Sequence, residues 1–219
     1  MNLTEQLFEI ANIGAEWVLW VLLSLSVISI AIIADRSFFM WRRRVDVSRL
    51  QSRLAELVDR GELRVAVDEF TSVRAMEAQV VSVGLAKFEM GSSSVSELMN
   101  GALSGQRQQY ERFLPFLATV GSNAPFIGLF GTVLGIIQAF ARFDLTSGVS
   151  ASAGIMRAIS EALIATGMGL LVAIPAVIAF NVFKSRINRA AANTDQLART
   201  LIAYLSVKEP SSVSAGRRE

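Results

Sequence analysis

The chain has 219 residues, of which 52 % are hydrophobic and 18 % are charged, and its formal net charge at pH 7 is +2. It contains no cysteine and no histidine, which excludes disulfides, thiol nucleophiles, zinc sites of the Cys/His kind and imidazole acid–base catalysis. So apolar a composition is rare in a soluble domain of this size. We therefore expect membrane spans, and neither an enzyme nor a metal or cofactor site.

Three runs of 18 or more residues carry no charged residue, namely 17–34, 113–141 and 162–183. As helices rising about 1.5 Å per residue, each is long enough to cross a hydrocarbon core of roughly 30 Å. The segment 1–16 contains glutamates but no Lys or Arg, so it lacks the positive region of a cleaved signal peptide. The sequence thus predicts an all-α integral membrane protein with three transmembrane helices, the first of which stays in the mature chain.

Lys and Arg mark the ends of spans that stay in the cytoplasm. Here they follow the first span, precede the second and follow the third, as Arg36, Arg42, Arg43, Arg44, Arg107, Arg112, Lys184, Arg186 and Arg189. The opposite ends carry only Arg142 and Arg157. We therefore expect the N-terminus outside and the C-terminus inside, with long helices that extend into a helical cytoplasmic domain.

This topology divides the chain into periplasmic, membrane and cytoplasmic segments. In chain order they are a periplasmic or interfacial N-terminus (1–16), the first span (17–35), a cytoplasmic helical domain (36–112), the second span (113–141), a periplasmic loop (142–156), the third span (157–183), a cytoplasmic helix (184–208) and a tail (209–219). The tail is polar and has no regular spacing of apolar residues that could pack on another helix, so we expect it to be disordered.

The cytoplasmic segments read as helices. A helix over SRLQSRLAELV (48–58) is expected to begin near Asp46 and Ser48, which are residue types that cap helices. It is expected to stop at Arg60-Gly61, where a basic residue in the last turn is followed by a glycine. Further helices are expected over roughly 62–70 and 73–90, and from Ser96 directly into the second span. After the third span, a seam for packing on another helix recurs at steps of three and four. Its residues are Ile187, Ala190, Thr194, Leu197, Leu201 and Tyr204.

Small residues form one stripe on each of the second and third spans. Spaced by three or four, they are Pro125, Gly128, Thr132, Gly135 and Ala139 in the second span, with Gly131 beside them, and Ala162, Thr166, Gly169, Ala173 and Ala176 in the third. In lipid, small residues mark helix faces that meet protein or water. The first span has no glycine and reads as a helix that faces lipid. Pro125 and Pro175 are expected to kink their helices.

The two threonines are expected at similar depth, each about nine residues from the outer end of its span. Thr132 and Thr166 then line a shared cavity or face each other. The alternative is that each stripe is only a packing seam, with each threonine hydroxyl donating to the carbonyl four residues earlier in its own helix.

Glu161 is the one acid near the outer half of a span, and acids in membranes are functional candidates. It either lines an ion path or pairs with Arg157 four residues earlier. The middle of all three spans has no titratable residue. If the chain conducts protons, another subunit must therefore supply the carboxylate.

GSNAPFIGLFGTVLGI (121–136) and SEALIATGMGLLVAIPAVIAFNVF (160–183) closely resemble the TolQ/ExbB branch of the MotA/TolQ/ExbB proton-channel family. The resemblance covers roughly 105–190. It implies a homopentamer in the bacterial inner membrane around a dimer of single-span ExbD/TolR-like helices, whose aspartate accepts protons. It also implies a TonB- or TolA-like partner that carries the motion to the outer membrane, and it assigns the ion path to Thr132, Thr166 and Glu161.

The chain departs from relatives at Leu134, where many have tryptophan, and it lacks the fourth span of flagellar stators. The leading hypothesis is a proton-channel subunit of a motor that serves outer-membrane transport, envelope maintenance or gliding. The alternative is a scaffold that holds a single-span partner and conducts nothing. Nucleic-acid binding is not expected, because attraction between flanking arginines and lipid headgroups explains the basic charge.

Overall fold

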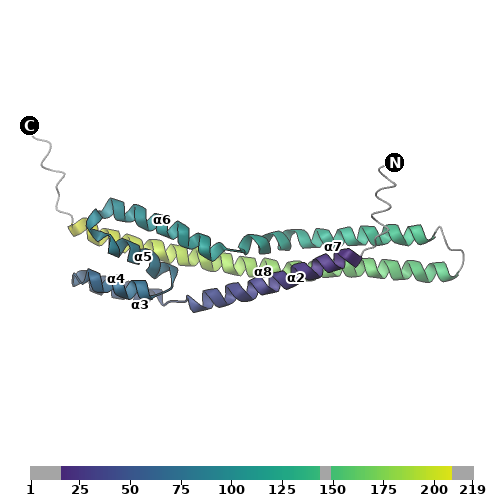
Figure 1. The fold of residues 1–219 in the computed structure, drawn as a ribbon, viewed down its shortest axis with the longest axis horizontal. Coiled ribbons are helices and arrows are strands. Elements are labelled where there is room, and N and C mark those ends of the chain that lie inside the picture. Colours follow the sequence, from purple (N-terminus) through teal and green to yellow (C-terminus); the bar gives the residue numbers. More distant parts are fainter. Residues whose placement is uncertain (1–15, 144–148, 209–219) are drawn as a thin grey trace, which may run out of the picture. The chain divides into compact units, whose positions relative to one another are not determined.

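The computed structural model describes the backbone of residues 16–143 and 149–208, and the side chains of 16–140 and 154–207. Figure 1 shows that the regular elements of this part of the chain are all helices, as predicted. The helices are α2 (Glu16–Arg42), α3 (Val47–Asp59), α4 (Leu63–Ser72), α5 (Met76–Ala86), η1 (Phe88–Met90), α6 (Ser92–Glu111), α7 (Leu114–Phe143) and α8 (Val149–Lys208). The predicted N-terminal segment before residue 16, the centre of the predicted loop (144–148) and the tail 209–219 lie outside the described residues.

Three of these helices, α2, α7 and α8, are long and apolar enough to cross a membrane, which confirms the three predicted spans. Helix α8 already begins at Val149, inside the range that the sequence assigns to the loop. It then continues for 60 residues, well past the third span. Pro125 and Pro175 lie inside continuous helices, where each removes one backbone donor.

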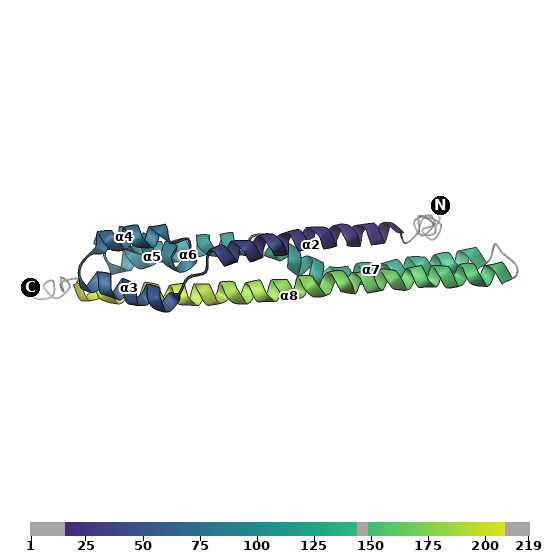
Figure 2. The same ribbon diagram turned by 90° about the horizontal axis from the view of Figure 1, so that it is seen from below.

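The described residues form two compact units. The membrane unit comprises 16–35 and 113–183, and the bundle unit comprises 36–112 and 184–208. Within the membrane unit, α7 runs alongside the first part of α8 (Figures 1 and 2). Within the bundle unit, helices α3 to α6 gather along the last part of α8.

One face of α2 is buried, which the expectation of a lipid-facing helix did not include. Val18, Leu22 and Ser29 are at most 3 % exposed, whereas Trp20 and Val27 are more than 60 % exposed. The buried positions are separated by four and seven residues, which is the repeat of one helix face. The apolar composition hid this pattern, because lipid-facing and protein-facing residues in a span are equally hydrophobic.

The bundle unit is held by apolar side chains and by helix caps that the sequence predicts. Asp46 is the N-cap of α3 and accepts a hydrogen bond from the Arg49 N–H at 3.3 Å. Gly61, with φ of +72°, follows the end of this helix. The core draws on α3 to α6 and α8 and includes Leu54, Leu57, Phe70, Met76, Leu85, Val95, Met99, Leu197 and Leu201.

The predicted seam of α8 is largely confirmed. Its members Ile187, Thr194, Leu197 and Leu201 are at most 1 % exposed. Ala190 and Tyr204 are only half-buried, however, and their neighbours Ala191 and Leu205 are buried instead. The face therefore drifts by one residue at each of these two turns, as expected when a straight helix of 3.6 residues per turn meets several neighbours.

The prediction of an unbroken helix from Ser96 into the second span is wrong. Helix α6 starts earlier, at Ser92, and ends at Glu111, and Phe113 takes a positive φ of +66° before α7 begins at Leu114. Pro115 explains the break, because its ring would clash with the carbonyl of Glu111 four residues earlier in a continuous helix. In the first turn of a new helix the same proline is tolerated.

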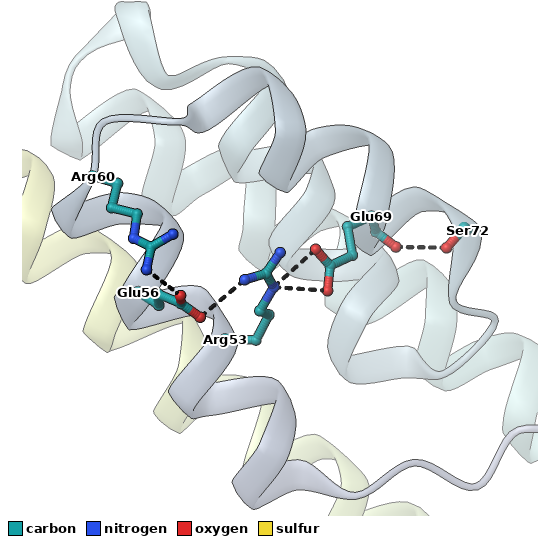
Figure 3. Close-up of polar contacts among 5 residues, drawn as sticks. All are labelled: Arg53, Glu56, Arg60, Glu69 and Ser72. Carbon is teal, nitrogen blue, oxygen red and sulfur yellow. Dashed lines mark hydrogen bonds and ion pairs between the residues drawn. The ribbon is translucent and has the colours of Figure 1, made fainter.

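An arginine-centred cluster of ion pairs joins α3 to α4 (Figure 3). Arg53 donates to Glu69 at 3.0 Å and to Glu56 at 2.9 Å, and Arg60 pairs with the other oxygen of Glu56 at 2.7 Å. The hydrogen bond from Arg53 and the charge of Arg60 lower the pKa of Glu56. These side chains are substantially exposed, so the cluster orients the two helices more than it stabilises them.

Candidate functional site

The small stripes of α7 and α8 pack directly against each other. A Cβ atom added to Gly128 would lie 2.6 Å from the carbonyl oxygen of Ala165, and one added to Gly169 would lie 2.6 Å from that of Ala124. One added to Gly135 would lie 2.7 Å from the Ala162 Cβ. Such distances are too short for any side chain, so only glycine permits this approach of the two backbones.

Most of the predicted stripe residues are buried in this seam. Gly128, Gly135, Ala162, Gly169 and Ala173 are buried, whereas Pro125 is half-buried and Pro175 is exposed. The prediction did not include Ala124 and Ala165, which are both 0 % exposed. Each lies four residues before a seam glycine, and this spacing could have identified them.

Helix α2 covers one edge of the seam. Gly131 is the contact point, because a Cβ there would lie 2.8 Å from the Ala165 Cβ and 3.2 Å from Val18. Nearby, the rings of Trp17 and Phe130 meet edge to face at 6.2 Å. Gly131 therefore marks the side of the α7/α8 pair on which α2 packs.

The two threonines lie on the opposite edge of the seam. Gly131 and Ala165 mark the α2 side, and Thr132 and Thr166 are the next residues along their helices. One residue corresponds to a rotation of about 100° around a helix, which turns each threonine away from α2. Because α7 and α8 are antiparallel, these rotations lead to the same side of the pair. The structure thus brings both hydroxyl-bearing residues to one edge, which we call the threonine edge.

Both threonine hydroxyls donate to backbone carbonyls. The Thr132 Oγ1 donates to the Leu129 oxygen at 2.6 Å, within its own helix, and the Thr166 Oγ1 donates across the seam to the Gly128 oxygen at 3.3 Å. Thr166 therefore lies opposite Gly128, and the two hydroxyls are offset along the seam by up to about one turn, roughly 5 Å. Each oxygen keeps lone pairs that can accept a hydrogen bond from an acid or from water.

Glu161 is not on the threonine edge. It lies about 140° from Thr166 around α8, and its Oε1 accepts a hydrogen bond from the Arg157 Nε at 2.9 Å. Both side chains are exposed. The structure therefore contains the ion pair that the sequence offers as the alternative to an ion path, and it does not bring Glu161 to the threonines.

The seam offers no titratable group of its own. The uncharged runs 113–141 and 162–183 supply only hydroxyls, small residues and apolar side chains. Among the described residues, no group of three or more acids is arranged to hold a metal ion. Sequence reasoning also missed Ser29 of α2, which is 3 % exposed and has no hydrogen-bond partner among the described residues. The threonine edge can therefore accept hydrogen bonds, but the group that donates them must come from another chain.

Comparison with known proteins decides the class. Residues 72–196, more than half of the chain, match the profile described as the MotA/TolQ/ExbB proton channel family. The chain belongs to this family. The Tol-Pal system protein TolQ of Haemophilus influenzae is 35 % identical over 195 residues, which cover 83 % of this chain and 84 % of that protein.

Other relatives agree with this assignment. The biopolymer transport protein ExbB of Salmonella typhimurium is 28 % identical over 211 residues, covering 91 % of this chain and 85 % of that protein. The TolQ protein of Pseudomonas aeruginosa is 50 % identical over 92 residues, but this match spans only 42 % of this chain and 39 % of that protein. The resemblance found in the sequence is confirmed. The chain is a multi-pass protein of the bacterial inner membrane and an energy-transducing subunit of the Tol-Pal or TonB type, and its family is not one of enzymes.

Proposed function

We propose that this chain is the proton-channel subunit of an inner-membrane motor complex. In this complex, proton flow does mechanical work on a TonB- or TolA-like partner. Family membership supports the proposal, and so does the absence of any titratable residue from the middle of the spans. A path for protons through hydrocarbon needs such a residue. A single-span ExbD/TolR-like helix with a membrane aspartate would supply it, inside a homopentamer of this chain.

The threonine edge is where we propose that the partner's carboxyl group passes. The observation that carries the proposal is that Thr132 and Thr166, from two different helices, reach the same edge of a seam whose other edge α2 covers. A protonated carboxyl can donate to a threonine oxygen, which lowers the cost of holding the acid in a dry channel. We place Glu161, paired with Arg157, near the outer entrance of the path.

Proton uptake by proteoliposomes that contain the purified complex tests this role. Thr132→Val and Thr166→Val keep the side-chain shape but remove the hydroxyl. Leaving the proton of the neutral carboxyl without an acceptor in a dry channel costs about 1–3 kcal/mol, so we expect proton uptake to fall about tenfold. Thr132→Ser and Thr166→Ser should retain most of the uptake, because they keep the oxygen.

Thr119→Val is the matched control on α7. Its hydroxyl is exposed and bonds only to the Pro115 oxygen of its own helix, at 2.9 Å, so its loss should leave proton uptake unchanged. If the valine variants at Thr132 and Thr166 conduct like the parent and still hold the partner, the conducting role is refuted. That result would favour the scaffold function, in which the hydroxyls only tie α7 and α8 together.

A further inference from the structure

The bundle unit contains a basic pocket that the proposed proton path does not use. Its volume is about 440 Å³, and four arginines line it, Arg43 and Arg44 after α2 and Arg186 and Arg189 on α8. Glu77, Tyr110 and Asn193 complete its polar wall. A cavity of this size can hold a small ligand or the headgroup of a larger one.

Within the described part of the chain, three of the four arginines have no carboxylate partner. Among the described residues, no Asp or Glu lies within ion-pair distance of Arg44, Arg186 or Arg189. Arg43 is held by aromatic rings instead, 4.1 Å above Phe39 and 5.4 Å from Tyr110. Several positive charges around one cavity repel each other, and an anion between them would relieve that repulsion.

The one acid in the pocket does not neutralise these charges. Glu77 is 6 % exposed, and it is hydrogen-bonded to Asn193 rather than to an arginine. Burial raises the pKa of Glu77, which favours its uncharged form. With one carboxyl group against four guanidinium groups, the lining of the pocket has an excess of positive charge whatever the protonation state of Glu77.

A second pocket in the same unit has equal numbers of arginines and acids in its lining. It has a volume of about 740 Å³ and lies beside α3 and α4. Three arginines and three acids line it, namely Arg44, which lines both pockets, Arg49 and Arg53, together with Asp46, Glu56 and Glu69. Ion pairs tie Arg53 to Glu56 and Glu69 there. A surplus of arginine is thus a property of the smaller pocket and not of every hollow in this unit.

We propose that the basic pocket binds a phosphate group, through the guanidinium groups of Arg44, Arg186 and Arg189. Guanidinium is planar and offers paired N–H donors that match phosphate oxygens. The amide of Asn193 is a further donor on the wall. Arg186 and Arg189 follow the uncharged run 162–183 by only three and six residues along α8, about 5 and 9 Å. This position suits a phospholipid headgroup, and a soluble phosphate ester offers the same chemistry.

The test titrates the purified complex in a neutral detergent with two probes, micellar phosphatidylglycerol and inorganic phosphate, and follows the thermal unfolding midpoint. Two double variants remove the same charge. Arg186→Gln with Arg189→Gln alters the pocket, and Arg64→Gln with Arg74→Gln alters exposed arginines outside it. All four side chains are exposed, so both variants should fold. Arg44→Gln, on another segment of the pocket, is a second pocket variant.

We expect at least one probe to stabilise the parent complex, and the pocket variants to bind it about tenfold more weakly while the control variant binds normally. A response to phosphatidylglycerol alone identifies a lipid headgroup, and a response to inorganic phosphate identifies a soluble source. The proposal is overturned if neither probe stabilises the parent, or if the control variant loses binding as much as the pocket variants do. Equal losses would mean that net charge, and not the pocket, attracts the anion.

Discussion

Gly169 offers the sharpest test of how the two membrane helices pack. In Gly169→Ala the added methyl carbon would lie 2.6 Å from the Ala124 oxygen and 3.1 Å from the Gly128 Cα. Both are backbone atoms, which cannot turn aside as a side chain can. Ordinary contact requires at least 3.4 Å, so α7 and α8 must separate by about 1 Å.

The expected cost of this separation is about 1–3 kcal/mol, the usual penalty of overpacking. Alanine regains at most about 1 kcal/mol through its better helix propensity, so a net loss of stability remains. Gly167→Ala is the matched control, because a Cβ there meets nothing within 4 Å. It should be neutral or slightly stabilising.

The assay is thermal unfolding of the purified chain in detergent, followed by circular dichroism. We expect the unfolding midpoint of Gly169→Ala to fall by several degrees while that of Gly167→Ala stays at or above the parent value. Equal midpoints for the two variants would refute the close packing of α7 on α8 at this glycine.

Two further predictions concern the bundle unit. The Tyr110 hydroxyl accepts a hydrogen bond from the buried Met76 N–H at 3.2 Å at the start of α5, so Tyr110→Phe should lower the free energy of unfolding by about 1–3 kcal/mol. Unchanged denaturant unfolding would contradict this role. Burial raises the pKa of Glu77 above its usual value near 4.5, so the folded state binds the proton more tightly and the parent loses stability as pH rises through the interval above about 4.5. Glu77→Gln has no group that titrates at this position, so its unfolding midpoint should exceed that of the parent at neutral pH and equal it in acid. If the midpoint of the parent instead rises relative to that of the variant as pH increases, the sign of the prediction is wrong.

The sequence predicts the helical elements well where a local signal exists. Uncharged runs predict the three spans, and Asp46 and Gly61 predict the two ends of α3. The break between α6 and α7 also has a local signal, Pro115, which outweighs the helical pattern on either side of it. The prediction of a continuous helix failed because it relied on the helical pattern on both sides of Pro115 and did not count the proline as a break.

The site was only partly predictable, for a physical reason. A stripe of small residues shows that a helix face is packed closely, but not what packs on it. The stripes of α7 and α8 turn out to meet each other, and the buried face of α2 had no distinct composition. The placement of Thr132 and Thr166 on one edge follows only when Gly131, Ala165 and Val18 are known to touch.

Cysteine cross-linking tests the central claim, that the threonine edge faces the partner's membrane helix. The chain has no cysteine, so single cysteines can be introduced without background. Leu171 is the matched control, because it is 60 % exposed and lies on the face of α8 away from α7. A second cysteine is introduced into the partner, beside its membrane aspartate. Thr166→Cys is expected to form a disulfide with it, and Leu171→Cys is not. Cross-linking through Leu171→Cys, with none through Thr166→Cys, would contradict the account.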